Sequence, residues 1–281
     1  MAESNHAKMA LPARRNRPAA AAPSDAEQAD PLYNQSLEKG LAVLRSFDAA
    51  HRTMTLAEIA ERTGMTRASA QRTVHTLQVL GYVGKDGQTR RFRLLARSMD
   101  IGFNYIASHP LVQAANPYLA QLASASGETA SLTEPLDFDM LYVAQRMTTQ
   151  FIPVLTPVGM RIPMYCTSSG RAWMSCLPDE QVRALLQGST RVARTPATLT
   201  GIAAIQARIA ACRKLGYATN DEELFLGDMG IAAPIVDRRG RPHGAVHVSP
   251  PTSRWTLEAA QKKLAPMVIE CARAIASALP H

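Results

Sequence analysis

The segment TLAEIAERTGMTRASAQRTVHTLQVLGYVGKDGQTRRFRL, residues 55–94, carries the densest structural signals in the chain. Thr55 and Glu58 form a capping box, in which each side chain satisfies a free backbone N–H at a helix start, so they predict the beginning of one helix. Gly64 supplies the backbone freedom for a turn. Thr66 can cap the free N–H groups of a second helix. The segment therefore predicts two helices separated by a tight turn.

The second predicted helix has one apolar face and ends at Gly81, a typical C-terminal stop. Its apolar residues recur at helical spacing: Ala70, Val74, Leu77 and Leu80. A hairpin is expected next, with its turn at Asp86-Gly87. Its returning strand alternates basic and apolar residues: Arg91, Phe92, Arg93 and Leu94. The whole pattern predicts a winged helix-turn-helix.

The opposite face of the second helix carries hydrogen-bond donors and acceptors rather than mixed charges. Such side chains can read base edges in the major groove, where Arg pairs with guanine and Gln with adenine. Residues 51–97 hold nine Lys or Arg and three acids, a net charge of +6 in a chain whose total is +8. We therefore expect a double-stranded DNA operator as a partner. The residues expected to contact it are Thr66, Arg67, Ser69, Gln71, Arg72, His75, Arg90, Arg91 and Arg93.

A small helical subdomain with an ordinary polar face is the alternative interpretation, because a helix-turn-helix pattern is short. The charge distribution argues against it. A basic excess concentrated in one sixth of the chain is typical of phosphate binding.

The composition is that of a globular protein with room for two domains in its 281 residues. Its four cysteines are dispersed, so the sequence predicts neither a zinc site nor disulfides, and no cofactor is expected. The uncharged stretch 101–127 is interrupted by Pro, Asn, Gln and His, so no membrane segment is expected. The N-terminus lacks the apolar core of a signal peptide. These features predict a cytoplasmic protein.

Changes in composition divide the chain into four parts. Residues 1–31 are rich in Ala and Pro without periodicity, so we expect a disordered tail. The winged helix-turn-helix is assigned to 32–96, a linker helix to 97–109 and a second domain to 110–281. A leading helix over 36–47 is expected to bury one side: Leu37, Leu41 and Leu44.

The second domain mixes predicted strands with predicted helices. Strands are expected at 129–133, 140–146, 151–156, 230–236 and 245–249. Helices are expected at 110–125, 179–186, 201–215 and 257–279, with Pro266 bending or interrupting the last one. A sheet with helices on its faces and ends is an α+β architecture rather than an alternating parallel sheet.

Small polar residues open another predicted helix at Thr167-Ser168-Ser169-Gly170. Free N–H groups at a helix start can hold a carboxylate, although an ordinary N-cap explains the pattern at least as well. Further polar groups fall at strand ends or inward positions: Tyr142, Arg146, Asn220, His247 and Ser249. Arg146 is a candidate carboxylate clamp, because its guanidinium is planar and permanently charged, although a surface arginine is the commoner outcome. His247 and Ser249 share one face of a strand, which lines a ligand site or faces solvent.

Five segments taken together resemble the IclR family of bacterial transcriptional regulators. They are SLEKGLAVLRSF, LAEIAERTGMTRASAQRTVHTLQVLGYV, GMRIPMYCTSSGRAWM, GYATNDEEL and GIAAPIVDRRGRPHGAVHVSPP. The resemblance covers about residues 34–280. It implies a winged helix-turn-helix, a linker helix and a C-terminal effector domain similar to the GAF fold. It also implies a homodimer or homotetramer that binds a pseudo-palindromic operator, and the branch most similar to this chain controls catabolism of aromatic acids.

The family's effector pocket, transferred position by position, falls on Ser168, Ser169, Gly170, Asn220, Gly230, His247 and Ser249. Some members have Asp in place of Asn220, and Cys and Ser in place of Gly230 and His247. The loss of an acid and the gain of a histidine suit a more anionic or larger ligand, and Gly230 leaves room for a ring. The resemblance implies an aromatic carboxylate effector such as protocatechuate, 4-hydroxybenzoate or a phthalate.

A ligand-responsive regulator rather than an enzyme is therefore expected. An enzyme could use Cys166 beside His247, but no nucleophile elbow, metal-ligand spacing or phosphate loop accompanies them. Two alternatives stay open: a constitutive architectural DNA-binding protein, and a regulator that senses a sugar acid or a short keto acid.

Overall fold

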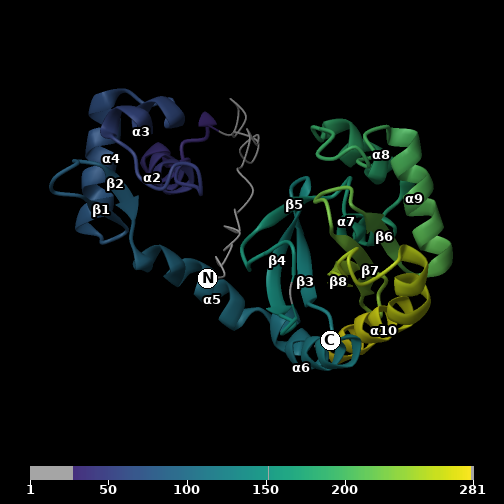
Figure 1. Ribbon diagram of the computed structural model, residues 1–281. Helices are drawn as coiled ribbons and strands as arrows, with labels where there is room; N and C mark the ends of the chain where they lie inside the picture. The colour runs from purple at the N-terminus through teal and green to yellow at the C-terminus, as the bar shows by residue number, and fades with distance from the viewer. Residues whose placement is uncertain (1–27, 151, 280–281) are drawn as a thin grey trace, which may run out of the picture. The chain divides into compact units, whose positions relative to one another are not determined.

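The computed structural model describes residues 28–150 and 152–279 (Figure 1). Within that part, the chain forms two compact units that meet between Asn104 and Tyr105. Of the tail predicted at 1–31, residues 1–27 lie outside the described residues.

The N-terminal unit packs three helices against a two-stranded antiparallel hairpin. These elements are α2 (Gln35–Ser46), α3 (Leu56–Thr63), α4 (Arg67–Val79), β1 (Val83–Lys85) and β2 (Phe92–Leu94). The predicted capping box is formed: Glu58 N donates to Thr55 Oγ1 at 3.3 Å, and Thr55 N donates to Glu58 Oε2 at 2.6 Å. Gly64 ends α3 with a φ of 66°, which L side chains rarely adopt. The predicted winged helix-turn-helix is therefore the structure of this unit.

The apolar side of α2 differs from the prediction. Leu37 is 63% exposed and Leu41 38% exposed, whereas Val43 and Phe47 are buried. These residues lie on two adjacent sides of α2, and a helix buries the side that contacts its neighbours. Here the packing of α2 against α3 and α4 selects the stripe of Val43. Leu80, predicted in the buried face of the second helix, is exposed beyond the end of α4.

A helix that buries none of its residues follows the hairpin. A 3-10 turn, η1 (Ala96–Ser98), leads into α5 (Met99–Ser108), where the linker helix is expected. The side chains of Met99, Ile101 and Phe103 are 74%, 57% and 67% exposed. The helix therefore presents a large apolar surface to its surroundings.

The C-terminal unit is built on a six-stranded sheet in which all neighbouring strands are antiparallel. Its strands are β3 (Ala130–Leu136), β4 (Asp139–Arg146), β5 (Arg161–Pro163), β6 (Ala218–Asp221), β7 (Met229–Val236) and β8 (Pro242–Val248). Their spatial order is β5-β4-β3-β8-β7-β6. Strands from the two ends of the unit's sequence therefore pair at the centre of the sheet.

Helices lie on both sides of this sheet (Figure 1). On one face, α6 (Pro110–Ser126) and α10 (Leu257–Ala278) pack side by side over a core that includes Leu119, Val246 and Val268. On the other side lie α7 (Ser168–Met174), α8 (Asp179–Gly188) and α9 (Ile202–Leu215). The unit has the α+β architecture that the sequence predicts. None of the described helices is long and apolar enough to span a membrane.

One predicted strand is not formed, one strand is not predicted, and the predicted interruption of the last helix is not observed. Phe151 lies outside the described residues, and residues 152–156 form no strand. Pro153 and Pro157 explain this, since proline has no N–H to donate to a ladder. Strand β6 is not predicted because its sequence ATND lacks a pattern rich in β-formers. Helix α10 continues through Pro266 rather than stopping there.

A buried ion pair joins α7 to the segment after β6. Arg171 is fully buried, and its Nη1 and Nη2 donate to the two carboxylate oxygens of Glu223, each at 2.5 Å. Its Nε and Nη2 also donate to the carbonyl of Tyr165, and its Nη1 to the carbonyl of Thr219. All five guanidinium N–H groups therefore have acceptors.

We expect Glu223→Gln to lower the free energy of unfolding by about 3–5 kcal/mol, because it leaves a buried guanidinium without its countercharge. Chemical denaturation followed by the fluorescence of Trp173 and Trp255, both in the C-terminal unit, measures this change. Asp179→Asn is the matched control, since Asp179 is 78% exposed where it pairs with Arg213 and should contribute less than about 1 kcal/mol. Equal, small effects of the two substitutions would contradict a structural role for the pair.

Candidate nucleic-acid interface and ligand site

The exposed face of α4 carries the side chains predicted to read DNA. Arg67, Gln71, Arg72 and His75 are exposed, while Val74 on the opposite side is buried. In the part of the chain that the structure describes, no hydrogen bond or ion pair holds these four polar side chains. They are therefore available to a partner, as base readout requires.

Thr66 and Ser69 lie at the N-terminal end of the same helix. Thr66 Oγ1 accepts a hydrogen bond from Ser69 N at 3.2 Å and so forms the N-cap. Its hydroxyl proton is still available, so Thr66 can donate to a phosphate while it caps the helix. The positive end of the helix dipole favours the same anion.

The wing presents two of its three predicted arginines to solvent. Arg90 and Arg93 are exposed. Arg91 instead turns back on its own unit, where Nη2 donates to Glu58 Oε2 at 2.9 Å and to the carbonyl of Thr53 at 3.0 Å. The carboxylate that caps α3 is also the nearest countercharge for Arg91. Arg91 therefore fastens the wing to α3, whereas Arg90 and Arg93 have their side chains exposed.

A second set of polar side chains lies on the face of the sheet below α7. Ser131 is the partner of both Gln145 on β4 and His247 on β8, so these three residues form one row across the sheet. Gln145 Nε2 donates to Ser131 Oγ at 3.1 Å and to Thr156 Oγ1 at 3.2 Å. Tyr142 lies on this face as well, and so does Asn220 on β6.

Tyr142 and His247 contact each other within this face. Tyr142 OH and His247 Nε2 are 3.2 Å apart, and the two rings meet edge to face with centroids 5.3 Å apart. Burial lowers the pKa of His247 to about 4 and raises the pKa of Tyr142. Both groups are therefore uncharged at neutral pH. His247 Nδ1 is buried and has no hydrogen-bond partner among the described residues.

The first residues of α7 close over the same face. A Cβ atom on Gly230 would lie 2.4 Å from Ser168 Oγ and 2.5 Å from Asn220 Oδ1, so these three residues converge. The expectation that Gly230 leaves room for a ring is therefore wrong, because these two side chains fill the space beside it. The hydroxyl of the neighbouring Ser169 is buried and, within residues 28–150 and 152–279, without a hydrogen-bond partner. Ser249, half-buried and two residues beyond His247, alternates onto the same face. We call these groups, together with Tyr142 and the row across the sheet, the polar site.

The backbone of Gly170 is not open to a ligand in the polar site. A Cβ on this residue would lie 2.3 Å from Met164 Cα, so close packing against that backbone requires glycine. The N–H of Gly170 donates to Thr167 Oγ1 at 3.3 Å, which is an ordinary N-cap. Ser168 and Ser169 are therefore the residues of this turn that can meet a ligand.

Arg146 lies on the opposite face of the sheet, contrary to its predicted role as a carboxylate clamp. In a regular strand it would share a face with Tyr142, four residues earlier. A β-bulge at Val143 reverses the alternation of side chains between them. Arg146 Nη2 consequently donates to Asn116 Oδ1 on α6 at 3.1 Å.

Sequence reasoning missed four residues near this face: Ser131, Gln145, Thr156 and Asp228. The alternation of Ala130, Ser131 and Leu132 could have placed Ser131, since its neighbours are core residues. The other three residues could not be placed from the sequence. The bulge puts Gln145 on a face that regular alternation would not assign to it, Thr156 lies in a loop, and Asp228 precedes β7 without a regular pattern.

Cys166 is not placed to act as a nucleophile. Burial raises the pKa of its thiol to about 12, so the reactive thiolate is scarce at neutral pH. No group of three His, Cys, Asp or Glu side chains in the described residues is arranged to hold a metal ion.

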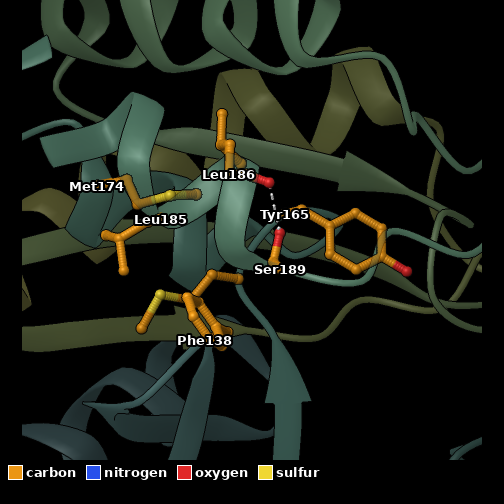
Figure 2. Close-up of a pocket in the computed structure, with 7 residues that line it drawn as sticks. Phe138, Tyr165, Met174, Leu185, Leu186 and Ser189 are labelled. Carbon is orange, nitrogen blue, oxygen red and sulfur yellow. Dashed lines mark hydrogen bonds between the residues drawn. The ribbon is translucent and has the colours of Figure 1, made fainter. Parts of the chain in front are cut away.

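A recess beside α7 and α8 is apolar (Figure 2). It is lined by Phe138, Met164, Tyr165, Met174, Leu185, Leu186 and Ser189. Figure 2 shows Ser189 Oγ bonded to the carbonyl of Leu186, at 3.0 Å, so its hydroxyl is satisfied locally. The recess encloses no room for a water molecule, and we assign no ligand to it.

Two family models match the two parts of the chain. The IclR helix-turn-helix domain matches residues 36–87. The C-terminal domain of the bacterial transcriptional regulator IclR matches residues 103–277, more than half of the chain.

Relatives and solved structures agree with these matches. The Pca regulon regulatory protein of Pseudomonas putida is 35% identical over 260 residues, covering 91% of this chain and 89% of the relative. A solved structure described as a transcriptional regulator from Rhodococcus sp. RHA1 is 35% identical, with a TM-score of 0.77 over 88% of this chain and 98% of that one.

An IclR homologue from Microbacterium hydrocarbonoxydans, solved in complex with 4-hydroxybenzoate, shares the fold. Its TM-score is 0.73 at 20% identity, over 87% of this chain and 98% of that one. The chain belongs to the IclR family, whose members regulate transcription in bacteria and are not enzymes.

Proposed function

We propose that the protein is a cytoplasmic regulator of a catabolic operon that responds to a small aromatic carboxylate. In this proposal residues 32–96 bind a pseudo-palindromic operator, 97–109 form the linker, and 110–281 bind the effector. The exposed face of α4, with Arg67, Gln71, Arg72 and His75 unattached in the described structure, is the observation that carries the DNA-binding part.

The polar site supports the response to a ligand. A buried polar atom without a partner costs about 1–3 kcal/mol, so natural proteins keep few of them. Ser169 Oγ and His247 Nδ1 are two such atoms within the described residues, and they lie on the same side of the sheet. A carboxylate can accept hydrogen bonds from groups of this kind.

The relatives favour an aromatic acid over other acids. The Pseudomonas relative regulates a Pca regulon, and the Microbacterium homologue was solved with 4-hydroxybenzoate. Sugar acids and short keto acids are the competing effectors, and a binding experiment should include them.

The first prediction concerns the major-groove and phosphate contacts. Arg72→Ala or Gln71→Ala should weaken operator binding by about 1–3 kcal/mol and random-DNA binding less, because these side chains read bases. Arg93→Ala should weaken both alike and reduce the salt slope by about 0.9 for each phosphate that is no longer neutralised. Fluorescence anisotropy with both DNAs over a range of salt concentrations measures these effects.

Two further arginine variants serve as comparisons in that experiment. Arg208→Ala, exposed on α9, should leave DNA binding unchanged. Arg91→Ala should destabilise the N-terminal unit, since it removes the ion pair with Glu58. If Arg72→Ala and Gln71→Ala weakened operator and random DNA equally, the assignment of α4 to the major groove would be wrong.

The second prediction concerns the effector. Protocatechuate, 4-hydroxybenzoate, phthalate or terephthalate should raise the melting temperature, because a ligand at a hundred times its Kd stabilises the folded state by about 2.7 kcal/mol. Ser169→Ala should melt at or above the temperature of the wild type without ligand but show a smaller shift with ligand, since its hydroxyl has no partner in the described protein. Ser189→Ala, in the apolar recess, is the control.

The panel also contains sugar acids and short keto acids. A shift with these alone would replace the aromatic effector by the competing class. No shift with any acid would favour the architectural alternative. An unchanged ligand shift in Ser169→Ala would remove that residue from the ligand site.

The third prediction concerns assembly. The exposed apolar side of α5 should pair with a second copy, because helix-turn-helix modules read duplex half-sites as two-fold pairs. Phe103→Lys should therefore lower the oligomeric state measured by light scattering and weaken operator binding. Val192→Lys, at a side chain 53% exposed in the other unit, is the control. An unchanged mass for Phe103→Lys would exclude α5 from the interface.

A further inference from the structure

The imidazole of His247 has one nitrogen in contact with a partner and one without. Nε2 lies 3.2 Å from the hydroxyl of Tyr142, and the two rings meet edge to face at an interplanar angle of 70°. Nδ1 is buried and, within residues 28–150 and 152–279, has no hydrogen-bond partner. Ser131, the cross-strand neighbour of His247, does not bond it either. Which nitrogen carries the proton therefore decides what Nδ1 can bind.

A series of hydrogen bonds leads to His247 and gives its contact with Tyr142 a direction. The amide nitrogen of Gln145 can only donate, and it donates to Thr156 Oγ1 at 3.2 Å. The hydroxyl proton of Thr156 is then free for the phenol oxygen of Tyr142. Burial raises the pKa of this phenol, and the hydrogen bond from Thr156 opposes that shift. The phenol proton in turn is left for Nε2 of His247, which accepts it.

The opposite direction would leave more polar groups unsatisfied. If Nε2 of His247 donated to Tyr142, the phenol proton would lack an acceptor among the described residues, and Nδ1 would be an acceptor without a donor. If the phenol donates, Nδ1–H is the one group left unpaired in this contact. Unpaired buried polar groups are costly, so the second arrangement is favoured. Burial lowers the pKa of His247 to about 4, so the ring is neutral and carries a single proton.

We infer that Tyr142 is a positioning residue that holds His247 in the tautomer with its proton on Nδ1, so that His247 donates a hydrogen bond to the carboxylate of the effector. This inference rests on the proposed function, because it assigns chemistry to the same site. The positions that the family resemblance implies include His247 but not Tyr142.

A donor at Nδ1 suits a carboxylate. An ionised carboxyl group only accepts hydrogen bonds, so it can satisfy Nδ1–H and would be repelled by an unprotonated Nδ1. The unpaired hydroxyl of Ser169 lies on α7, which packs against β8, the strand of His247. The two oxygens of one carboxylate can accept one hydrogen bond from each of these groups. The tautomer of His247 thus determines whether the polar site favours an anion.

The tautomer can be measured without a ligand. Nitrogen NMR of protein with isotope-labelled histidines distinguishes protonated from unprotonated imidazole nitrogens, and His247→Asn identifies the signals of His247 among the seven histidines. We expect Nδ1 to be protonated and Nε2 unprotonated in the wild type at neutral pH. Tyr142→Phe keeps the ring but removes the hydroxyl, so it should give a mixture of tautomers. Tyr118→Phe, on α6 over the other face of the sheet, is the matched control and should leave the tautomer unchanged.

Calorimetry with 4-hydroxybenzoate and protocatechuate tests the donor role. Tyr142→Phe should weaken binding by about threefold to tenfold, which corresponds to the loss of one net hydrogen bond. His247→Leu removes the donor and should weaken binding at least about tenfold, because a hydrogen bond to a charged group is stronger. His247→Asn has an amide N–H close to the position of Nδ1, so it should bind within about threefold of the wild type. Tyr118→Phe should bind like the wild type.

Rescue by asparagine but not by leucine separates a donor role from a structural one, because the two side chains have similar shapes. A proton on Nε2 in the wild type would overturn the inference and leave the proposed function in place. Binding that neither Tyr142→Phe nor His247→Leu weakens would do the same. If no carboxylic acid of the panel bound, the proposed effector would fail, and the donor role of His247 would fail with it whatever the tautomer.

Discussion

The buried ion pair of Arg171 and Glu223 is the constraint on which the polar site depends. Arg171 belongs to the short helix that begins with Ser168 and Ser169, and Glu223 follows the strand that ends just after Asn220. All five guanidinium donors are engaged, two of them by the carboxylate and the rest by backbone carbonyls. Removing either partner would leave a buried charge alone, so the two walls of the site are held together. The pair is too occupied to bind a ligand itself.

The N-terminal unit could be predicted in detail because its signals are local. Thr55, Glu58 and Gly64 determine their own helix boundary within ten residues, and the structure has that boundary. The polar site depends on the register between distant strands instead. The extra residue at Val143 places Arg146 on the face of the sheet that packs against α6 and places Gln145 on the face of the polar site. The sequence of β4 alone does not indicate a bulge. The ion pair of Arg91 was not predicted for a related reason, since its partner Glu58 lies 33 residues away.

The end of the linker helix is tied to the central sheet through Glu134 on β3. Tyr105 OH donates to one oxygen of Glu134, and His109 Nε2 is 3.2 Å from the other. The same strand carries Ser131, which belongs to the polar site. A ligand can change DNA binding only if it has different affinities for two states of the protein. Strand β3 contacts both the polar site and the end of α5, so under the proposed function it is the element that connects the two.

The charges around the polar site show how it can hold an anion without a cation. Arg146 lies on the other face, Arg171 is bound to Glu223, and His247 is neutral because burial lowers its pKa to about 4. His247 therefore offers hydrogen bonding rather than positive charge. Neutral donors act over short distances and are little affected by salt, whereas phosphate contacts weaken steeply with it. Under the proposed function, effector binding and DNA binding should consequently respond differently to ionic strength, since each relies on a different kind of interaction.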